Sequence, residues 1–291
     1  MNPAPSVILF TALSGFGFGF MAFLAIGSPS VTGGYAFILW FVGYALAVGG
    51  LVLSTFHLGN PQRALLAFSQ WRSSWLSREA GAAVVTLMAL APMALSQWLG
   101  FAWPAVWGLV AGMLCFATVF TTSMIYAQLK TVPRWNHWTT PALFLAFALA
   151  GGAVLAGQVA LASVALIALG GLQLLAWRIG DTRFAQLGAT MGSATSLGNL
   201  GQVQVFEQPH TGENYLMREM IHVVGRKHAQ KLRGIALGLA VVLPLALMLF
   251  TDAGPVTLTL AALVHLAGVL ASRWLFFAQA EHVVGLYYGK R

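Results

Sequence analysis

The sequence has little charge: only 8% of its 291 residues are charged, whereas 58% are hydrophobic. Soluble domains carry about 25% charged residues, so this composition excludes an ordinary soluble protein. The hydrophobic runs are apolar on all sides for about 20 residues, unlike the alternating strands of a membrane barrel. Because lipid admits only helices or closed barrels as spanning structures, we predict an all-α, polytopic bundle of membrane helices.

Cysteine is nearly absent too, since Cys115 is the only one. A single thiol excludes an internal disulfide and also an iron–sulfur cluster, which needs about four cysteines. A Cys-x-x-Cys-His haem attachment is excluded for the same reason. The N-terminus MNPAPS lacks the basic segment of a secretory signal, so we expect the first hydrophobic run to be a retained span.

Eight hydrophobic runs have bilayer-spanning length. The fifth and sixth touch near Gly157 and Gln158, but one helix over both would be about 57 Å long, too long for a single crossing of about 30 Å. We therefore predict eight transmembrane helices in a single membrane domain, residues 1–291. The runs are roughly Ser6–Ile26, Tyr35–Phe56, Ala80–Leu99, Trp103–Leu129, Thr140–Gly157, Ala160–Trp177, Gly234–Phe250 and Pro255–Ala278.

The positive charges lie on one side of this topology. With eight spans, all but one of the 15 Lys and Arg residues fall in segments on the same face, and only Arg273 remains inside a span. The positive-inside rule makes this face cytoplasmic, so we predict a multi-pass protein of the bacterial inner (plasma) membrane with both termini in the cytoplasm. The net charge of +8 does not indicate nucleic-acid binding, because no soluble domain carries it.

One long extramembrane segment, residues 179–233, follows the sixth run. A loop this long is usually functional or disordered, and its aromatic, Glu and Arg residues argue against simple disorder. We therefore predict a cytoplasmic docking surface for a partner subunit. The basic residues Arg63, Arg72, Arg134, Arg226 and Lys227 either contact that partner or only obey the topology rule; both explanations can hold together.

Two ionisable residues stand at neighbouring helix ends. His57 ends the second run and Glu79 begins the third, so both lie near the cytoplasmic boundary. An imidazole can donate a hydrogen bond to a quinone carbonyl and titrates near physiological pH, and a nearby carboxylate can relay the proton. The structural alternative is that His57 caps a helix and that Glu79 complements the positive helix N-terminus.

Other polar and aromatic residues in the spans have two interpretations each. Arg273 either pairs with an acid, such as Glu79 or Glu281, or extends to the interface. Trp75 is either part of an aromatic belt or a stacking partner for a quinone ring, and the belt interpretation applies equally to Trp71, Trp135 and Trp138. His265 lacks a second histidine at its depth, so we expect a hydrogen bond to a neighbouring helix and neither haem nor another metal.

Several motifs together resemble one family. They are STFHLGNPQRA, SSWLSREA, TTSMIYAQLKTVPRW, PHTGENYLMREM, RKHAQKLR and RWLFFAQAEHVVGLYYG, and they extend from the second run to the C-terminus. The chain resembles the dimethyl sulfoxide reductase membrane-anchor family, DmsC, whose members have eight spans. Each motif alone would be weak, but the set is specific.

The resemblance implies an anchor subunit of a molybdenum oxidoreductase with three subunits. A catalytic partner holds the molybdopterin cofactor and performs the substrate reaction, a ferredoxin-like partner carries iron–sulfur clusters, and the anchor exchanges electrons with the quinone pool. The family's quinone-site histidine, in its HLG motif, maps onto His57, and the acid of its WLSRE motif maps onto Glu79. With Arg273 and Trp75, these are the predicted quinone-binding residues. The family carries no haem.

The direction of electron flow has two alternatives within the family. A sulfite dehydrogenase faces the cytoplasm and passes electrons into the pool, whereas a dimethyl sulfoxide reductase oxidises menaquinol at the outer face. We favour the sulfite branch, because His57, Glu79 and the long loop share the face predicted to be cytoplasmic. A purely structural tether and a solute transporter are the other hypotheses, and the transporter would need internal pseudo-symmetry, which we do not find. The quinone itself is either ubiquinone or menaquinone.

Overall fold

The computed structural model describes the chain except residues 57–59, 208–209, 211, 222–227 and 289–291. Its described residues form helices, turns and irregular segments but no strand, which confirms the predicted all-α class. The long helices are α1 (Pro5–Ala25), α2 (Gly33–Thr55), α3 (Trp75–Leu99), α4 (Ala105–Ala127), α5 (Thr139–Leu155), α6 (Val159–Gln186) and α11 (Pro255–Ala278). A further helical stretch comprises α9 (Ala229–Leu237), the π-helical turn η4 (Gly238–Val242) and α10 (Leu243–Phe250). The short elements are η1 (Pro61–Phe68), α7 (Met191–Thr195), η2 (Gly198–Leu200), α8 (Tyr215–Glu219) and η5 (Val283–Tyr288).

Seven helical stretches in the described part of the chain are long and apolar enough to cross a membrane, with α9 to α10 counting as one. This confirms a multi-pass membrane protein. Helix α5 has only 17 residues, or about 25 Å at 1.5 Å per residue, slightly less than a hydrocarbon core of about 30 Å. The count of eight spans therefore stays a prediction. The fifth and sixth runs do form two helices, which a turn at Gly157 (φ +69°) separates.

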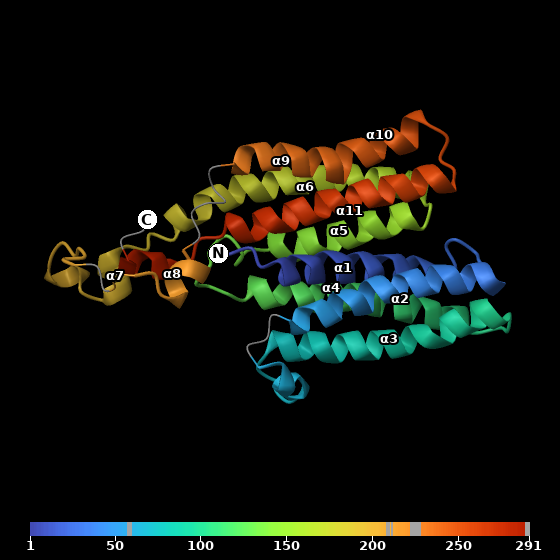
Figure 1. Ribbon diagram of the computed structural model, residues 1–291, viewed down its shortest axis with the longest axis horizontal. Helices are drawn as coiled ribbons and strands as arrows, with labels where there is room; N and C mark the ends of the chain where they lie inside the picture. The colour runs from blue at the N-terminus through green and yellow to red at the C-terminus, as the bar shows by residue number, and fades with distance from the viewer. Residues whose placement is uncertain (57–59, 208–209, 211, 222–227, 289–291) are drawn as a thin grey trace.

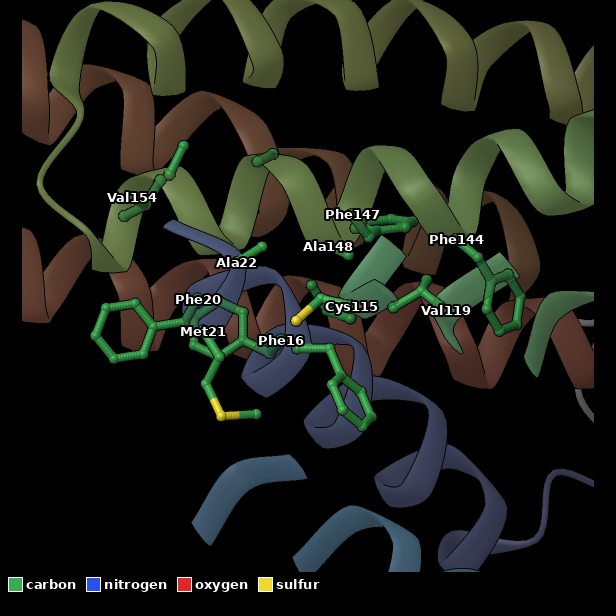
Figure 2. Close-up of a cluster of buried hydrophobic side chains, with 14 of the residues drawn as sticks. Phe16, Phe20, Met21, Ala22, Cys115, Val119, Phe144, Phe147, Ala148 and Val154 are labelled. Carbon is green, nitrogen blue, oxygen red and sulfur yellow. The ribbon is translucent and has the colours of Figure 1, made fainter. Parts of the chain in front are cut away.

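Helix α1 is the centre of the bundle. Its most apolar window is 78% buried, against 28% to 44% for the other candidate spans, and it packs on α2, α4, α5 and α11. In Figure 1, α2, α3 and α4 lie on one side of this centre, and α6, α9, α10 and α11 lie on the other. Figure 2 shows core side chains from α1, α4 and α5, including Phe16, Phe20, Cys115 and Phe144, in one cluster.

A small residue brings α1 and α5 into close contact. A Cβ atom on Gly19 would come within 2.0 Å of the Ala148 carbonyl oxygen, so any side chain there would push the helices apart. Between α1 and α2, a Cβ atom on Gly17 would meet the Ala47 backbone nitrogen at 2.5 Å, so a side chain there would separate these two helices. Glycines of this kind allow membrane helices to approach through backbone packing.

Three helix ends differ from the sequence predictions. Helix α6 continues to Gln186 and α9 already begins at Ala229, so helices extend into both ends of the segment predicted as a loop. Helix α3 begins at Trp75 rather than Ala80. In each case residues outside the apolar run, many of them polar, extend the helix, because the hydrogen bonds between residues four apart form in water as well as in lipid.

The segments rich in Lys and Arg gather at one end of the bundle, which we call the basic end. It is the end where α2, α4, α6 and α11 finish and where α7, α8 and η5 lie, on the left in Figure 1. The N-terminal ammonium group of Met1 is held there by the Ala280 carbonyl at 2.8 Å. The N-terminus and the residues after α11 thus share one end of the bundle.

Candidate functional site

Three residues that the sequence analysis selected, His57, Arg226 and Lys227, lie outside the described residues. Glu79, Arg273 and Trp75 lie within them.

A cavity of about 320 Å³ lies at the basic end, where α1, α2, α3, α4 and α11 converge. Its volume is within the range of about 300–1,000 Å³ typical of small-molecule sites. The wall includes Ser54, three residues before His57, and Leu76, three residues before Glu79. The full lining is Met1, Asn2, Ala4, Val7, Ser54, Leu76, Ile125, Tyr126, Leu129, Trp135, Tyr215, Glu219, Met220 and Phe277.

Helix α8 and the N-terminus close the outer side of this cavity. The backbone N–H of Asn2 donates to the Glu219 carbonyl at 2.7 Å, and the Asn2 amide lies 3.4 Å from both Glu219 carboxylate oxygens. Asn214 caps α8 by accepting from the Met217 N–H at 2.9 Å, and it donates to the Tyr288 hydroxyl at 2.9 Å. Part of the long segment predicted to be a docking surface is therefore also a wall of the cavity.

Glu79 lies on the face of α3 that packs against α4. The buried residues Glu79, Ala83 and Thr86 recur at helical spacing along this face. The Thr86 hydroxyl lies 2.8 Å from the Thr118 hydroxyl of α4, which fixes the register of the two antiparallel helices. Nearer the basic end, the Glu79 carboxyl on α3 meets the hydroxyl of Thr122 on α4.

The Glu79 side chain is only 4% exposed, and its Oε1 atom has no hydrogen-bond partner among the described residues. It is the fifth residue of α3, and the first turn of that helix has no acid, so the helix N-terminus alone does not explain it. The Thr122 hydroxyl, which also lies 3.0 Å from the Thr118 carbonyl, is the hydrogen-bond partner of this carboxyl group on α4. A buried carboxyl group with a neutral hydroxyl partner is a candidate for proton transfer.

Tyr126 connects Glu79 to the cavity. It lies one turn beyond Thr122, the Glu79 partner on α4, and lines the cavity. Its ring makes edge-to-face contacts with Trp135 (5.4 Å between centroids) and Phe277 (5.5 Å). The sequence analysis missed Tyr126 as a site residue. Its position in the motif TTSMIYAQLKTVPRW was the only available signal.

Arg273 lies in a different environment. It is 3% exposed, and its guanidinium stacks on the Phe144 ring at 3.5 Å from the centroid. No ion pair joins it to Glu79 in the described part of the chain, and its burial rules out extension to the interface. Arg273 lines a second, smaller cavity between α5, α6 and α11, whose lining does not include Glu79.

The tryptophans predicted to form an aromatic belt divide into two groups. Trp71 and Trp138 are exposed, as a belt requires, and Trp75 packs edge-to-face on Phe120 beneath the Arg78 guanidinium. Trp135 is only 2% exposed, and its indole N–H donates to the Phe276 carbonyl at 2.9 Å. The belt interpretation is therefore wrong for Trp135, because the turn before α5 directs this ring into the bundle.

Of the described arginines predicted to dock a partner, Arg63 and Arg72 are exposed. Arg134 instead forms an ion pair with Asp181 of α6 at 2.6 Å, and Arg233 of α9 binds the same carboxylate at 2.6 and 2.8 Å. This cluster connects the segment before α5 with α6 and α9. It fixes the arrangement of three helices at the basic end.

We expect Asp181→Asn to destabilise the protein by about 1–2 kcal/mol, because two partly buried guanidinium groups lose their shared charged acceptor. Thermal unfolding of the purified protein in detergent measures this loss. Asp252→Asn is the matched control, since Asp252 is exposed on the turn between α10 and α11 and should change stability by less than about 0.5 kcal/mol. Equal effects of the two substitutions would show that the cluster contributes no stability.

Two histidines have structural partners. The Nδ1 atom of His265 lies 2.6 Å from the Ala240 carbonyl in η4, which confirms the predicted hydrogen bond to a neighbouring helix. His282, after α11, accepts from the Val284 N–H at 3.0 Å. Burial and the nearby N-terminal ammonium lower the pKa of His282, so it is neutral at pH 7. The described residues contain no cluster of three His, Cys, Asp or Glu side chains that could hold a metal.

Comparison with known proteins agrees with these features. The chain is 28% identical, over 323 aligned residues that cover 99% of both chains, to the C subunit of the sulfite dehydrogenase from Allochromatium vinosum. A family model described as DMSO reductase anchor subunit (DmsC) matches residues 3–289. The chain therefore belongs to the DMSO reductase anchor subunit (DmsC) family.

Proposed function

We propose that this protein is the quinone-reactive membrane anchor of a molybdenum oxidoreductase. An iron–sulfur subunit docks at the basic end and exchanges electrons with a quinone in the cavity of about 320 Å³. A molybdopterin subunit performs the substrate reaction. The observation that carries the proposal is the position of this cavity, beside a buried carboxyl group and beneath the segment expected to meet the partner.

The lining of the cavity suits a quinone headgroup. Aromatic and aliphatic side chains from α3, α4 and α11 supply an apolar wall, and Ser54, Tyr126 and Tyr215 supply hydroxyl groups. Ligand sites usually combine a mostly apolar wall with a few polar groups of this kind. The histidine that the family resemblance assigns to the quinone site, His57, follows Ser54 by three residues.

Reduction of a quinone to a quinol consumes two electrons and two protons. The electrons come from the iron–sulfur subunit, and water at the basic end supplies the protons. Glu79 follows the cavity-lining Leu76 by three residues, has an oxygen without a hydrogen-bond partner among the described residues, and lies by the Thr122 hydroxyl, which suits the transfer of a proton between water and the bound carrier. Tyr126 lies between this carboxyl group and the cavity.

We assign the complex to the sulfite-oxidising branch, with electrons flowing into the quinone pool. The similarity to the sulfite dehydrogenase protein over nearly the whole chain supports this assignment. The clustering of positive charge at the end that holds the cavity and α8 also supports it, because the positive-inside rule makes that end cytoplasmic. Partner, quinone site and both termini then share the cytoplasmic side of the inner membrane.

A substitution that fills the cavity tests the proposal. We expect Ser54→Phe to lower quinone-linked turnover of the intact complex at least 10-fold, because the added ring fills space that a headgroup would occupy. Reduction of an artificial electron acceptor by the catalytic subunits should not change. Turnover with a short-chain quinone and with the artificial acceptor, measured on the same preparation, provides both readings.

Val52→Phe is the matched control, because it adds a ring to the same helix at a side chain that is 51% exposed and outside the cavity lining. Its quinone-linked turnover should equal that of the unmodified complex. An unchanged KM and turnover for quinone in Ser54→Phe would place the quinone site elsewhere. Failure of the chain to co-purify with molybdenum and iron would reject the anchor function itself.

A further inference from the structure

The smaller cavity that Arg273 lines is rich in hydrogen-bond donors. It has a volume of about 40 Å³ and lies between α5, α6 and α11. A cavity needs about 10–15 Å³ to hold one water molecule, so this one has room for a small ion with one or two waters. Its polar lining is Arg134, Thr139, Thr140, Gln173, Ser272, Arg273 and Gln279.

Arg273 has no protein counterion in this cavity among the described residues. It is 3% exposed, and its Nε atom has no hydrogen-bond partner in the part of the chain that the structure describes. Its guanidinium stacks on Phe144 at 3.5 Å and on Phe147 at 5.2 Å from the ring centroids, which is a favourable cation–π contact. A buried charge without an opposite charge beside it is costly, and ring stacking supplies no opposite charge.

The acids near this cavity have other partners or lie outside it. Asp181 binds Arg134 and Arg233. Glu281 lines a separate pocket together with Arg134 and interacts with that arginine. Glu79 is on α3 and does not line the cavity. No carboxylate lines the cavity within the described ranges, whereas Arg273 and Arg134 both do.

The amide groups of the lining also leave donors for a ligand. The oxygen of Gln173 accepts from the Ser272 hydroxyl at 2.9 Å, so its NH₂ group is the part still able to bind. In the orientation that satisfies its neighbours, the oxygen of Gln279 accepts from Arg233 at 2.8 and 3.0 Å, which likewise leaves its NH₂ group. Thr140 donates its hydroxyl proton to the Trp135 carbonyl at 2.8 Å.

We propose that this cavity binds one monovalent anion of halide size, which serves as the counterion of Arg273. The guanidinium group supplies the charge, and the amide of Gln173 supplies a neutral donor. Such an ion removes the electrostatic cost of a buried cation at the meeting point of three helices. The site is separate from the proposed quinone cavity, because only the quinone cavity contacts α1, α2, α3 and α4.

The test compares the intact purified complex in halide-free gluconate buffer with the same complex in bromide at equal ionic strength. Ligands that bind only the folded state raise its stability, so we expect bromide to raise the unfolding midpoint of this subunit by about 2–4 °C or more. Crystals grown in bromide should show an anomalous difference peak within the cavity beside Arg273. Equal midpoints together with an empty or water-filled cavity would overturn the proposal.

Gln173→Glu supplies a second test that does not depend on removing the arginine. The substitution places a fixed carboxylate in the cavity at almost unchanged volume, so bromide should no longer raise the midpoint, and stability in gluconate should equal or exceed that of the unmodified complex. Gln97→Glu is the matched control. Gln97 bonds to Trp40 and to the Leu24 carbonyl, so its variant should be less stable and should keep the full bromide response. A full bromide response in Gln173→Glu would place the anion elsewhere.

Discussion

Replacement of Glu79 by glutamine is expected to lower quinone-linked turnover by about 10²-fold or more, with assembly of the complex unchanged. Glutamine has nearly the same shape as glutamate but cannot exchange a proton, and proton transfer by a positioned group typically contributes about 10²–10⁴-fold to a rate. The carboxyl group is buried, and its hydrogen-bond partner on α4, the Thr122 hydroxyl, can also bond to an amide. The measurement is steady-state reduction of a short-chain quinone by the purified complex.

Two further readings separate a proton-transfer role from a structural one. Reduction of an artificial acceptor should be the same in Glu79→Gln as in the unmodified complex, because electrons then bypass the membrane site. Glu213→Gln, which changes an exposed acid next to α8, should affect neither reading. Normal quinone-linked turnover in Glu79→Gln would show that this carboxyl group only fills space between α3 and α4.

Removal of the Trp135 side chain should have the largest effect on stability. Its ring is 2% exposed and stacks on Phe276 at 5.1 Å between centroids with an interplanar angle of 12°. Substitution of a buried Trp by alanine typically costs about 3–5 kcal/mol, because it removes contacts and leaves a void. We expect a loss of this size for Trp135→Ala, measured by denaturant or thermal unfolding in detergent.

The neighbouring Trp138 provides the comparison. It lies three residues further along at the same end of the bundle but is 56% exposed, so Trp138→Ala should cost less than about 0.5 kcal/mol. Trp135→Phe should keep most of the ring contacts and lose the hydrogen bond to the Phe276 carbonyl, at about 1 kcal/mol. Similar losses for Trp135→Ala and Trp138→Ala would refute the buried position of Trp135.

Helix α8 belongs both to the wall of the cavity and to the long segment expected to meet a partner. Glu219 and Tyr215 line the cavity and belong to the long segment between α6 and α9. The contact between Asn2 and Glu219 holds this segment against the N-terminus. A protein that docks on α8 therefore touches a wall of the proposed quinone site, which places electron donor and acceptor close together without a long path through the bundle.

The amino-acid sequence by itself determined the class of this protein. Long apolar runs and scarce charge require helices in a membrane, because lipid leaves backbone groups no other partners. The same pattern separated α5 from α6 at Gly157 and placed Glu79 near the basic end of α3. These properties follow from the chemistry of consecutive residues, so the order of residues is sufficient to predict them.

Only the tertiary structure decided which side chains meet. Tyr126 and Trp135 line the proposed site together with Asn2 and Glu219, yet these residues come from four separate segments. Depth in the membrane placed Arg273 and Glu79 at similar levels, but only Arg273 lines the smaller cavity between α5, α6 and α11. Hydropathy is nearly uniform around these helices, so it does not specify which face turns inward. That choice depends on close contacts such as Gly19 against Ala148, which form only when the whole bundle assembles.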